Sequence, residues 1–175
     1  NTKAVPDIVD FARRLFGEVD VVLSPVDLIG VNGPYPAGPM APAGRAANED
    51  PRQWGRFGAA WTLAALAEMA RCGTTSATFF ELSGPRGLVD EGDASDVFAF
   101  FRDLALVRDE AMVASASSAP HRVATLAFRL GADVRAVVAN LTADRVEFAW
   151  DDAPAGGSNV LGPYEVLWCD VESRR

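Results

Sequence analysis

DPRQWGRFGAAWTLAALAEMARCGTTSATFFELSGPRG, residues 50–87, is the stretch that decides the predicted fold. Its start has the pattern of a helix N-terminus. Asp50 is a favoured N-cap residue, Pro51 suits the first helical position, and Gln53 is placed to reach back and complete a capping box. The apolar run that follows predicts a helix to about residue 71.

The predicted helix is followed by a strand that ends beside charged side chains. Thr74–Leu82 is β-branched and aromatic, which predicts a buried strand, and the Gly and Pro residues of 83–94 predict a loop. In α/β proteins, ligands and catalytic groups gather at the carboxyl ends of strands, because short loops there project polar side chains over a rigid sheet. Glu81, with Arg86 close behind it, is therefore a candidate acid, base or nucleophile.

The residues before and after this stretch continue the same alternation. Pro6–Phe16 predicts an amphipathic helix, and the nearly continuous apolar run within Glu18–Val26 is typical of a strand covered on both faces. Residues 27–49 are rich in Gly, Pro and Ala and predict a long loop. A third helix is predicted after Asp93 or Ser95. Helix and strand thus alternate up to about residue 109.

Beyond residue 110 the pattern changes to short period-2 segments separated by turns, which predict an antiparallel sheet. These segments are Met112–Ser117, Arg122–Arg129, Arg135–Leu141, Arg145–Trp150 and Tyr164–Val171. We therefore predict an α/β plus all-β fold with two domains. Residues 1–110 would form a partial (β/α) TIM-barrel segment, and residues 111–175 an antiparallel β-sandwich.

Two parallel strands do not make a self-contained sheet, because their apolar edges and faces need covering. The predicted barrel segment is thus incomplete by itself. The remaining strands would come from a missing N-terminal barrel portion or from a second copy of the chain, as a homo-oligomer.

Composition indicates a folded protein and argues against two kinds of partner. The 175 residues are 49% hydrophobic, which is enough for a sizeable core. The 16 basic and 24 acidic residues give a net charge of −8, whereas nucleic-acid binding needs concentrated Lys and Arg. The sequence has no apolar run of about 18 residues that would cross a bilayer and no basic-then-apolar leader. We therefore expect neither a nucleic-acid nor a membrane partner.

Cysteine and histidine usage indicates neither metal nor cofactor. Cys72 and Cys169 are far apart in the sequence and form no CxxC pattern, which fits a reduced compartment and hence a cytoplasmic location. His121 is the sole histidine, has no metal-ligand pattern around it and lies outside the barrel segment. We therefore expect no metal site and no Ser-His-Asp triad within the barrel segment. No Walker or Rossmann glycine pattern is present, so no cofactor is predicted.

Several runs of the sequence resemble the C-terminal third of D-apionate lactonase-type proteins. They are residues 24–26 (SPV), 57–66 (FGAAWTLAAL), 74–87 (TTSATFFELSGPRG), 138–142 (VANLT) and 161–166 (LGPYEV). Those proteins resemble glycoside hydrolases in architecture, with a TIM barrel and β-rich flanking domains. The resemblance spans nearly the whole chain and implies hydrolysis of a sugar-acid lactone. The family pattern has Trp at the position of Pro85 and Thr at that of Asp27, departures that concern the substrate more than the fold.

Five residues are candidates for the site of such a hydrolase. Glu81 and Asp27 each follow a predicted strand and would be the catalytic carboxylates. Arg86 would clamp a substrate carboxylate or carbonyl through bidentate hydrogen bonds. Tyr35 and Trp54 would stack on a sugar. Structural roles remain as alternatives: a Glu81–Arg86 ion pair that shapes the loop, a loop cap at Asp27, and core packing of Trp54.

Two other functions also fit the sequence. A glycoside hydrolase would use a pair of carboxylates in the same places. A chain that pairs with a copy of itself would be a non-catalytic carbohydrate-binding or assembly protein. Enzyme activity is expected only if upstream barrel strands complete the site.

Overall fold

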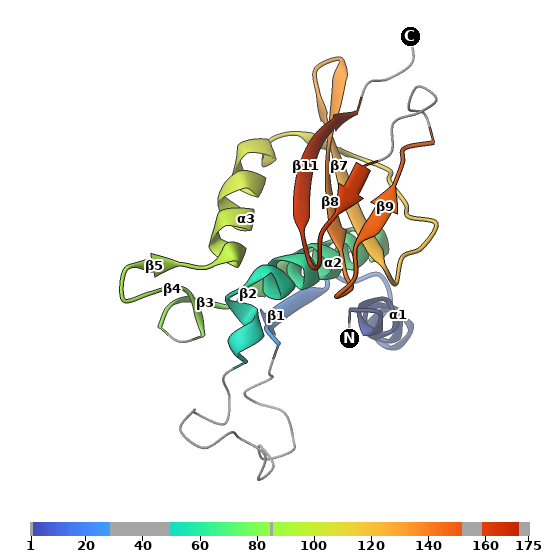
Figure 1. The fold of residues 1–175 in the computed structure, drawn as a ribbon. Helices are drawn as coiled ribbons and strands as arrows, with labels where there is room; N and C mark the ends of the chain where they lie inside the picture. Colours follow the sequence, from blue (N-terminus) through green and yellow to red (C-terminus); the bar gives the residue numbers. More distant parts are fainter. Residues whose placement is uncertain (1, 29–49, 85, 152–158, 172–175) are drawn as a thin grey trace.

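A computed structural model describes residues 2–28, 50–84, 86–151 and 159–171 (Figure 1). Its elements, in chain order, are α1 (Ala4–Phe16), β1 (Val22–Val26), the 3₁₀ turn η1 (Pro51–Gln53), α2 (Arg56–Cys72), β2 (Ser76–Phe79), β3 (Glu81–Ser83), β4 (Gly87–Asp90), β5 (Asp93–Ala94), α3 (Asp96–Leu104), η2 (Ala105–Val107), β6 (Ala111–Val113), β7 (Val123–Leu130), β8 (Asp133–Asn140), β9 (Val146–Phe148), β10 (Asn159–Leu161) and β11 (Val166–Val171). The predicted order of helix, strand, helix, strand and helix is present, followed by the predicted antiparallel strands.

Strands β1 and β2 form a parallel pair, as the alternation predicts. Val22 lies opposite Ser76 and Val26 lies opposite Phe79. No closed barrel is formed by the described residues, whose sheets contain two, two, four and three strands. The prediction that β1 is covered on both faces is wrong for this part of the chain, because Val22 is 59% exposed.

The C-terminal half is built on a four-stranded antiparallel sheet in the order β11-β8-β7-β6. On one face, Leu126 and Val137 of the sheet pack against Leu63 of α2 and against α3. On the other face, the antiparallel pair β9 and β10 packs on the sheet, with Leu161 at the centre of this contact. The main sheet therefore lies between helices on one side and a two-stranded ribbon on the other.

Helix α2 is the element that both halves share (Figure 1). Leu63 and Ala64 belong to the core against the antiparallel sheet, whereas Ala65 and Met69 pack against α1, β1 and β2. A helix that is apolar all round is typical of a buried position. Within the described part of the chain, no helix has the length and apolar content that a membrane span requires.

The start of α2 differs from the predicted capping box. Asp50 accepts a hydrogen bond from the backbone N–H of Arg52, as expected of a cap, but the 3₁₀ turn ends at Gln53 and α2 begins separately at Arg56. The Gln53 side chain does not reach back to the turn. It donates to the carbonyl oxygen of Arg86 at 2.6 Å, so a tertiary hydrogen bond replaces the local one.

The predicted strand Thr74–Leu82 is also wrong in its extent. β2 ends at Phe79, Phe80 has a φ of 54°, and β3 starts a small second sheet with β4 and β5. The ring of Phe80 packs against Trp61, with centroids 6.4 Å apart, and this contact accompanies the turned backbone. The segment predicted as a loop therefore contains two short strands, and Glu81 does not end a buried strand.

Gly58 explains why η1 can fold back on α2. A Cβ atom at this position would lie 2.1 Å from the carbonyl oxygen of Gln53, whereas one at Gly55 would meet nothing within 4 Å. We expect Gly58→Ala to lower the free energy of unfolding by about 1–3 kcal/mol, because the turn must move to admit the methyl group. Urea unfolding of this variant and of Gly55→Ala measures the effect, and equal losses in both would contradict it.

Leu63 tests the packing of α2 on the sheet. Its side chain is fully buried among residues of both halves. Leu63→Ala is expected to lower the free energy of unfolding by about 2–5 kcal/mol. Leu106→Ala, at a residue that is 73% exposed, is the matched control and should change it by less than about 0.5 kcal/mol. Similar losses in the two variants would show that this contact is absent.

Candidate functional site

Three of the five predicted site residues lie close together. Asp27 directly follows β1, Glu81 begins β3 just after β2, and Arg86 precedes β4. The Arg86 guanidinium forms an ion pair with the Glu81 carboxylate. Both charges also act on the Asp27 carboxyl group. The structure therefore places the Asp27 carboxyl group, after β1, within the electrostatic influence of an ion pair that follows β2.

The Arg86 segment is held from two sides. Gln53, which is buried, donates its side-chain N–H to the Arg86 carbonyl. Gly87 approaches the backbone of Ser83 so closely that a Cβ atom there would lie 2.5 Å from the Ser83 carbonyl carbon. These contacts tie the turn after β3 to the start of α2. The guanidinium thus extends from an anchored backbone toward Glu81.

The electrostatics of the three groups follow from their different exposure. Burial raises the pKa of Asp27 above its usual value, the Arg86 guanidinium lowers it, and the Glu81 carboxylate raises it. The side chain of Arg86 is 21% exposed and that of Glu81 is 51% exposed. The fold therefore favours the protonated form of the Asp27 carboxyl group.

A cavity of about 400 Å³ lies beside Asp27. Its walls include Arg52, Phe57, Trp61 and Tyr164. This volume is within the range of small-ligand sites, which combine apolar and aromatic walls with a few polar groups. The cavity therefore places one of the predicted carboxylates beside aromatic rings and a second guanidinium.

The cavity wall is ordered by contacts between the two halves. The Phe57 ring meets the Tyr164 ring edge to face at 5.2 Å, and the Arg52 guanidinium lies 4.8 Å from the Phe57 ring centroid. Asp50 also holds the guanidinium of Arg52, with Nε 2.9 Å from Oδ1. The cluster thus links the start of α2 to the loop before β11.

The sequence analysis missed most of this wall. Trp61, which the sequence analysis does not single out, is half-buried and lines the cavity. Tyr164 comes from the C-terminal half, 137 positions after Asp27, so no local pattern links the two. Arg52 could have been singled out, because it directly follows the Asp50-Pro51 helix start.

The other two predicted residues do not join the cluster in the described part of the chain. Trp54 is half-buried beside η1, and its carbonyl oxygen accepts a hydrogen bond from the Asp96 N–H at 2.9 Å. It is not among the residues that line the Asp27 cavity. Tyr35 lies outside the described residues. The roles predicted for these two side chains remain predictions.

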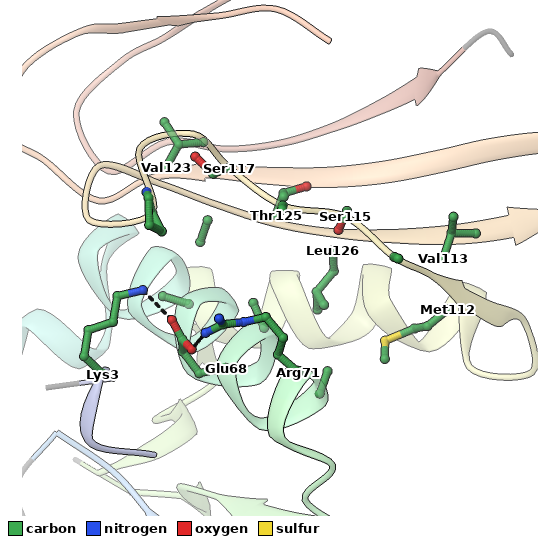
Figure 2. A pocket seen from close by; sticks show the side chains of 17 residues that line it. Lys3, Glu68, Arg71, Met112, Val113, Ser115, Ser117, Val123, Thr125 and Leu126 are labelled. Carbon is green, nitrogen blue, oxygen red and sulfur yellow. Dashed lines mark hydrogen bonds and ion pairs between the residues drawn. The ribbon is translucent and has the colours of Figure 1, made fainter. Parts of the chain in front are cut away.

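A larger cavity of about 650 Å³ lies between α2 and the segment that joins β6 to β7 (Figure 2). Glu68 is buried at its edge and pairs with both Lys3 and Arg71. Burial and the nearby Arg71 charge lower the pKa of Lys3. The rest of the lining is mainly apolar and includes Met112 and Leu126. This cavity therefore contains a paired buried carboxylate and none of the predicted site residues.

The described residues contain no group of three or more His, Cys, Asp or Glu side chains that could hold a metal ion. His121 lies exposed in the turn before β7.

The described residues form a mixed α/β structure in which the parallel pair β1 and β2 packs against helices. Residues 1–114 match the family "D-apionate lactonase, TIM barrel domain", and the chain belongs to this family. The predicted family resemblance is thereby confirmed for residues 1–114, and the match is consistent with the predicted TIM-barrel type of the N-terminal part.

Comparison with other proteins adds a likeness of fold. No curated protein matches the sequence. A structure titled "Crystal structure of conserved exported protein from Bacteroides fragilis" is similar, with a TM-score of 0.53 and 10% sequence identity. The match covers 96% of this chain and 41% of that chain. At this identity the likeness concerns the fold alone, and the chain spans well under half the length of that structure.

The raised pKa of Asp27 predicts a pH dependence of stability. The folded-state pKa of Asp27 lies above the unfolded value, so the protonated carboxyl group adds to the free energy of unfolding. This stabilisation is complete below the unfolded pKa and is lost as the pH rises through the folded pKa. Asn does not ionise, so the Asp27→Asn variant does not lose this stabilisation. The Tm of the variant minus the Tm of the unchanged chain should therefore increase from acid to neutral pH. The gain should be less than about 1 kcal/mol, because the carboxyl group is partly solvated.

Thermal unfolding at several pH values from 3 to 7 measures this difference. Asp133→Asn, at an exposed carboxylate that starts β8, is the control and should show a constant offset. A falling or flat Tm difference for Asp27→Asn would contradict the assigned burial.

Proposed function

We propose that the chain is the C-terminal part of a hydrolase that opens the ring of a sugar-acid lactone, with Asp27, Glu81 and Arg86 at the rim of its active site. One observation carries the proposal. The Arg86–Glu81 ion pair lies near Asp27, whose carboxyl group feels both charges, and Asp27 itself lines an aromatic-walled cavity in a chain that belongs to the D-apionate lactonase family. The carboxyl ends of parallel strands are where barrel enzymes position their catalytic groups.

The chemistry of the three groups fits this reaction. In lactone hydrolysis, water adds to the ring carbonyl carbon, the ring C–O bond breaks, and a hydroxy acid results. Asp27 as carboxylate would accept a proton from the attacking water and return it to the ring oxygen as that bond breaks. Its pKa is raised, so it lies closer to neutral pH than the pKa of an ordinary aspartate, and the group is a stronger base.

Arg86 and Glu81 would act on the carbonyl group. The Arg86 guanidinium has five N–H donors, so it can hold Glu81 and still donate to an oxygen that gains negative charge as water adds. Glu81 would fix the orientation of the guanidinium. The rings of Trp61 and Tyr164 offer apolar faces for a sugar ring in the adjoining cavity.

The proposal is tested with the lactone of D-apionate and the gene product as its host cell makes it. Asp27→Asn and Glu81→Gln are each expected to lower kcat by about 100-fold or more, the usual contribution of a general base or of an oriented charge. Glu147→Gln, an exposed carboxylate on β9, should change kcat by less than about twofold. Because Asp27 would act as a carboxylate, kcat of the unchanged chain should rise with pH as this group ionises. This rise should be absent in Asp27→Asn.

Other outcomes would point to the alternatives. Hydrolysis of chromogenic glycosides, lost in both carboxylate variants, would favour a glycoside hydrolase. Absence of turnover on lactones and glycosides, with sugar binding retained, would favour a non-catalytic binding protein. Full lactonase activity in both variants would exclude these residues from the reaction.

A further inference from the structure

The Asp27 cavity is lined by a guanidinium that the proposed reaction leaves without a role. Asp27 and Arg52 are the two charged side chains among the described residues that line this cavity. Two of the five N–H groups of the Arg52 guanidinium donate to Asp50, one from Nε and one from Nη2, and the other three have no partner within the described ranges. The side chain is 63% exposed, so these three donors are accessible to a ligand.

Asp50 fixes the orientation of the Arg52 guanidinium. Its carboxylate is buried, with 8% of the side chain exposed, and it also accepts a hydrogen bond from the backbone N–H of Arg52 at 2.9 Å. The guanidinium lies over the Phe57 ring, 4.8 Å from its centroid. A guanidinium that is held along one edge and against one face loses little freedom when it binds a ligand, so its free edge is preorganised.

The C-terminal half holds the Phe57 ring through a strained backbone conformation. Tyr164 packs edge to face on Phe57 and has a φ of 53°, which is uncommon for an aromatic residue. Its N–H donates to the carbonyl oxygen of Thr142 at 3.2 Å. The fully buried Asn140 fixes the same turn by donating from Nδ2 to the carbonyl oxygen of Gly162 at 2.8 Å. Strain of this kind persists only where the surroundings enforce it, and it clusters at ligand sites.

The charges around Arg52 favour a neutral ligand over an anion. The hydrogen bond from Arg52 lowers the pKa of Asp50, which therefore stays ionised and balances the guanidinium charge. The charges of Asp27, Asp50 and Arg52 sum to a negative value when Asp27 is ionised and to zero when it is protonated. An anionic ligand would add a further negative charge beside them, whereas hydroxyl oxygens accept hydrogen bonds without adding any.

We propose that Arg52 is a specificity-determining residue of this site. Its free N–H groups bind hydroxyl oxygens of a neutral, polyhydroxylated ring, while Asp50 and Asp27 disfavour the anionic, ring-opened form of the same compound. The inference rests on the proposed function and deepens it. A lactone is neutral and its hydrolysis product is an anion at neutral pH, so the charges that admit the substrate also favour release of the product.

A ring compound that cannot be hydrolysed tests the binding role separately from the reaction. Cis-tetrahydrofuran-3,4-diol has hydroxyl groups on a five-membered ring and no carbonyl group, and ligand-observed NMR titration measures its affinity for the gene product as its host cell makes it. Arg52→Met keeps an apolar stem over Phe57 but removes the donors, so it should weaken diol binding by about tenfold. Arg56→Met, at an exposed arginine that does not line this cavity, is the matched control and should change the affinity by less than about twofold.

Steady-state kinetics separate the same role from a structural one. With the lactone of D-apionate, Arg52→Met should raise KM by about tenfold and leave kcat within about threefold, because the donors act on the ground state and the transition state alike. With γ-butyrolactone, a ring without hydroxyl groups, kcat/KM should change by less than about twofold. Arg52→Lys keeps the charge without the planar fork and should resemble Arg52→Met more than the unchanged product.

Asp50→Asn tests the selection by charge. Asn keeps an acceptor for the backbone N–H of Arg52 and removes the negative charge beside the guanidinium. The affinity for D-apionate, the anionic product, should therefore rise by about threefold or more in the same NMR titration. Asp133→Asn, at an exposed carboxylate outside the cavity lining, is the control and should leave this affinity unchanged.

The inference and the proposed function fail in different ways. Diol binding that is lost in Arg52→Met, together with no lactone hydrolysis, would refute the lactonase and support the role of Arg52. Absence of diol binding to the unchanged product, or equal diol affinities in Arg52→Met and Arg56→Met, would overturn that role whatever the lactone assay shows. Full recovery in Arg52→Lys would assign the effect to charge alone, and an unchanged D-apionate affinity in Asp50→Asn would refute the selection against anions.

Discussion

The burial of α2 is the constraint on which the rest of the structure depends. Its small residues, Ala59, Ala60, Ala64 and Ala65, allow a strand pair and an antiparallel sheet to pack on different sides of one helix. A helix covered in this way keeps few charged side chains in its middle. Its buried carboxylate is accordingly paired with two cations, because an unpaired buried charge is strongly destabilising.

The candidate site follows from this packing. The N-terminal end of α2 brings Phe57 and Trp61 to the carboxyl end of β1, and the antiparallel half contributes Tyr164 to the same cavity. Residues from both halves thus form one wall. The polar groups come from the strand ends, where the backbone of Arg86 is anchored to the 3₁₀ turn by Gln53.

Much of the fold was predictable because it is local. The helices at Ala4–Phe16 and Arg56–Cys72 follow from apolar periodicity, and the antiparallel strands follow from period-2 alternation. The influence of the Glu81 charge on Asp27 agrees with the parallel pairing, because parallel strands place their carboxyl ends at one edge of a sheet. These inferences need only the periodicity of helices and strands and the distribution of apolar and polar side chains along the sequence.

The sequence by itself determined the type and order of the main elements, the parallel pairing of β1 with β2, and the polar residues at their ends. Tertiary structure alone decided the break at Phe80, the contact of Gln53 with the Arg86 carbonyl, and the arrival of Tyr164 at the cavity. The reason is physical. Each of these features depends on contacts between residues far apart in the sequence. The free energy of these contacts outweighs the local conformational preferences from which a sequence pattern is interpreted.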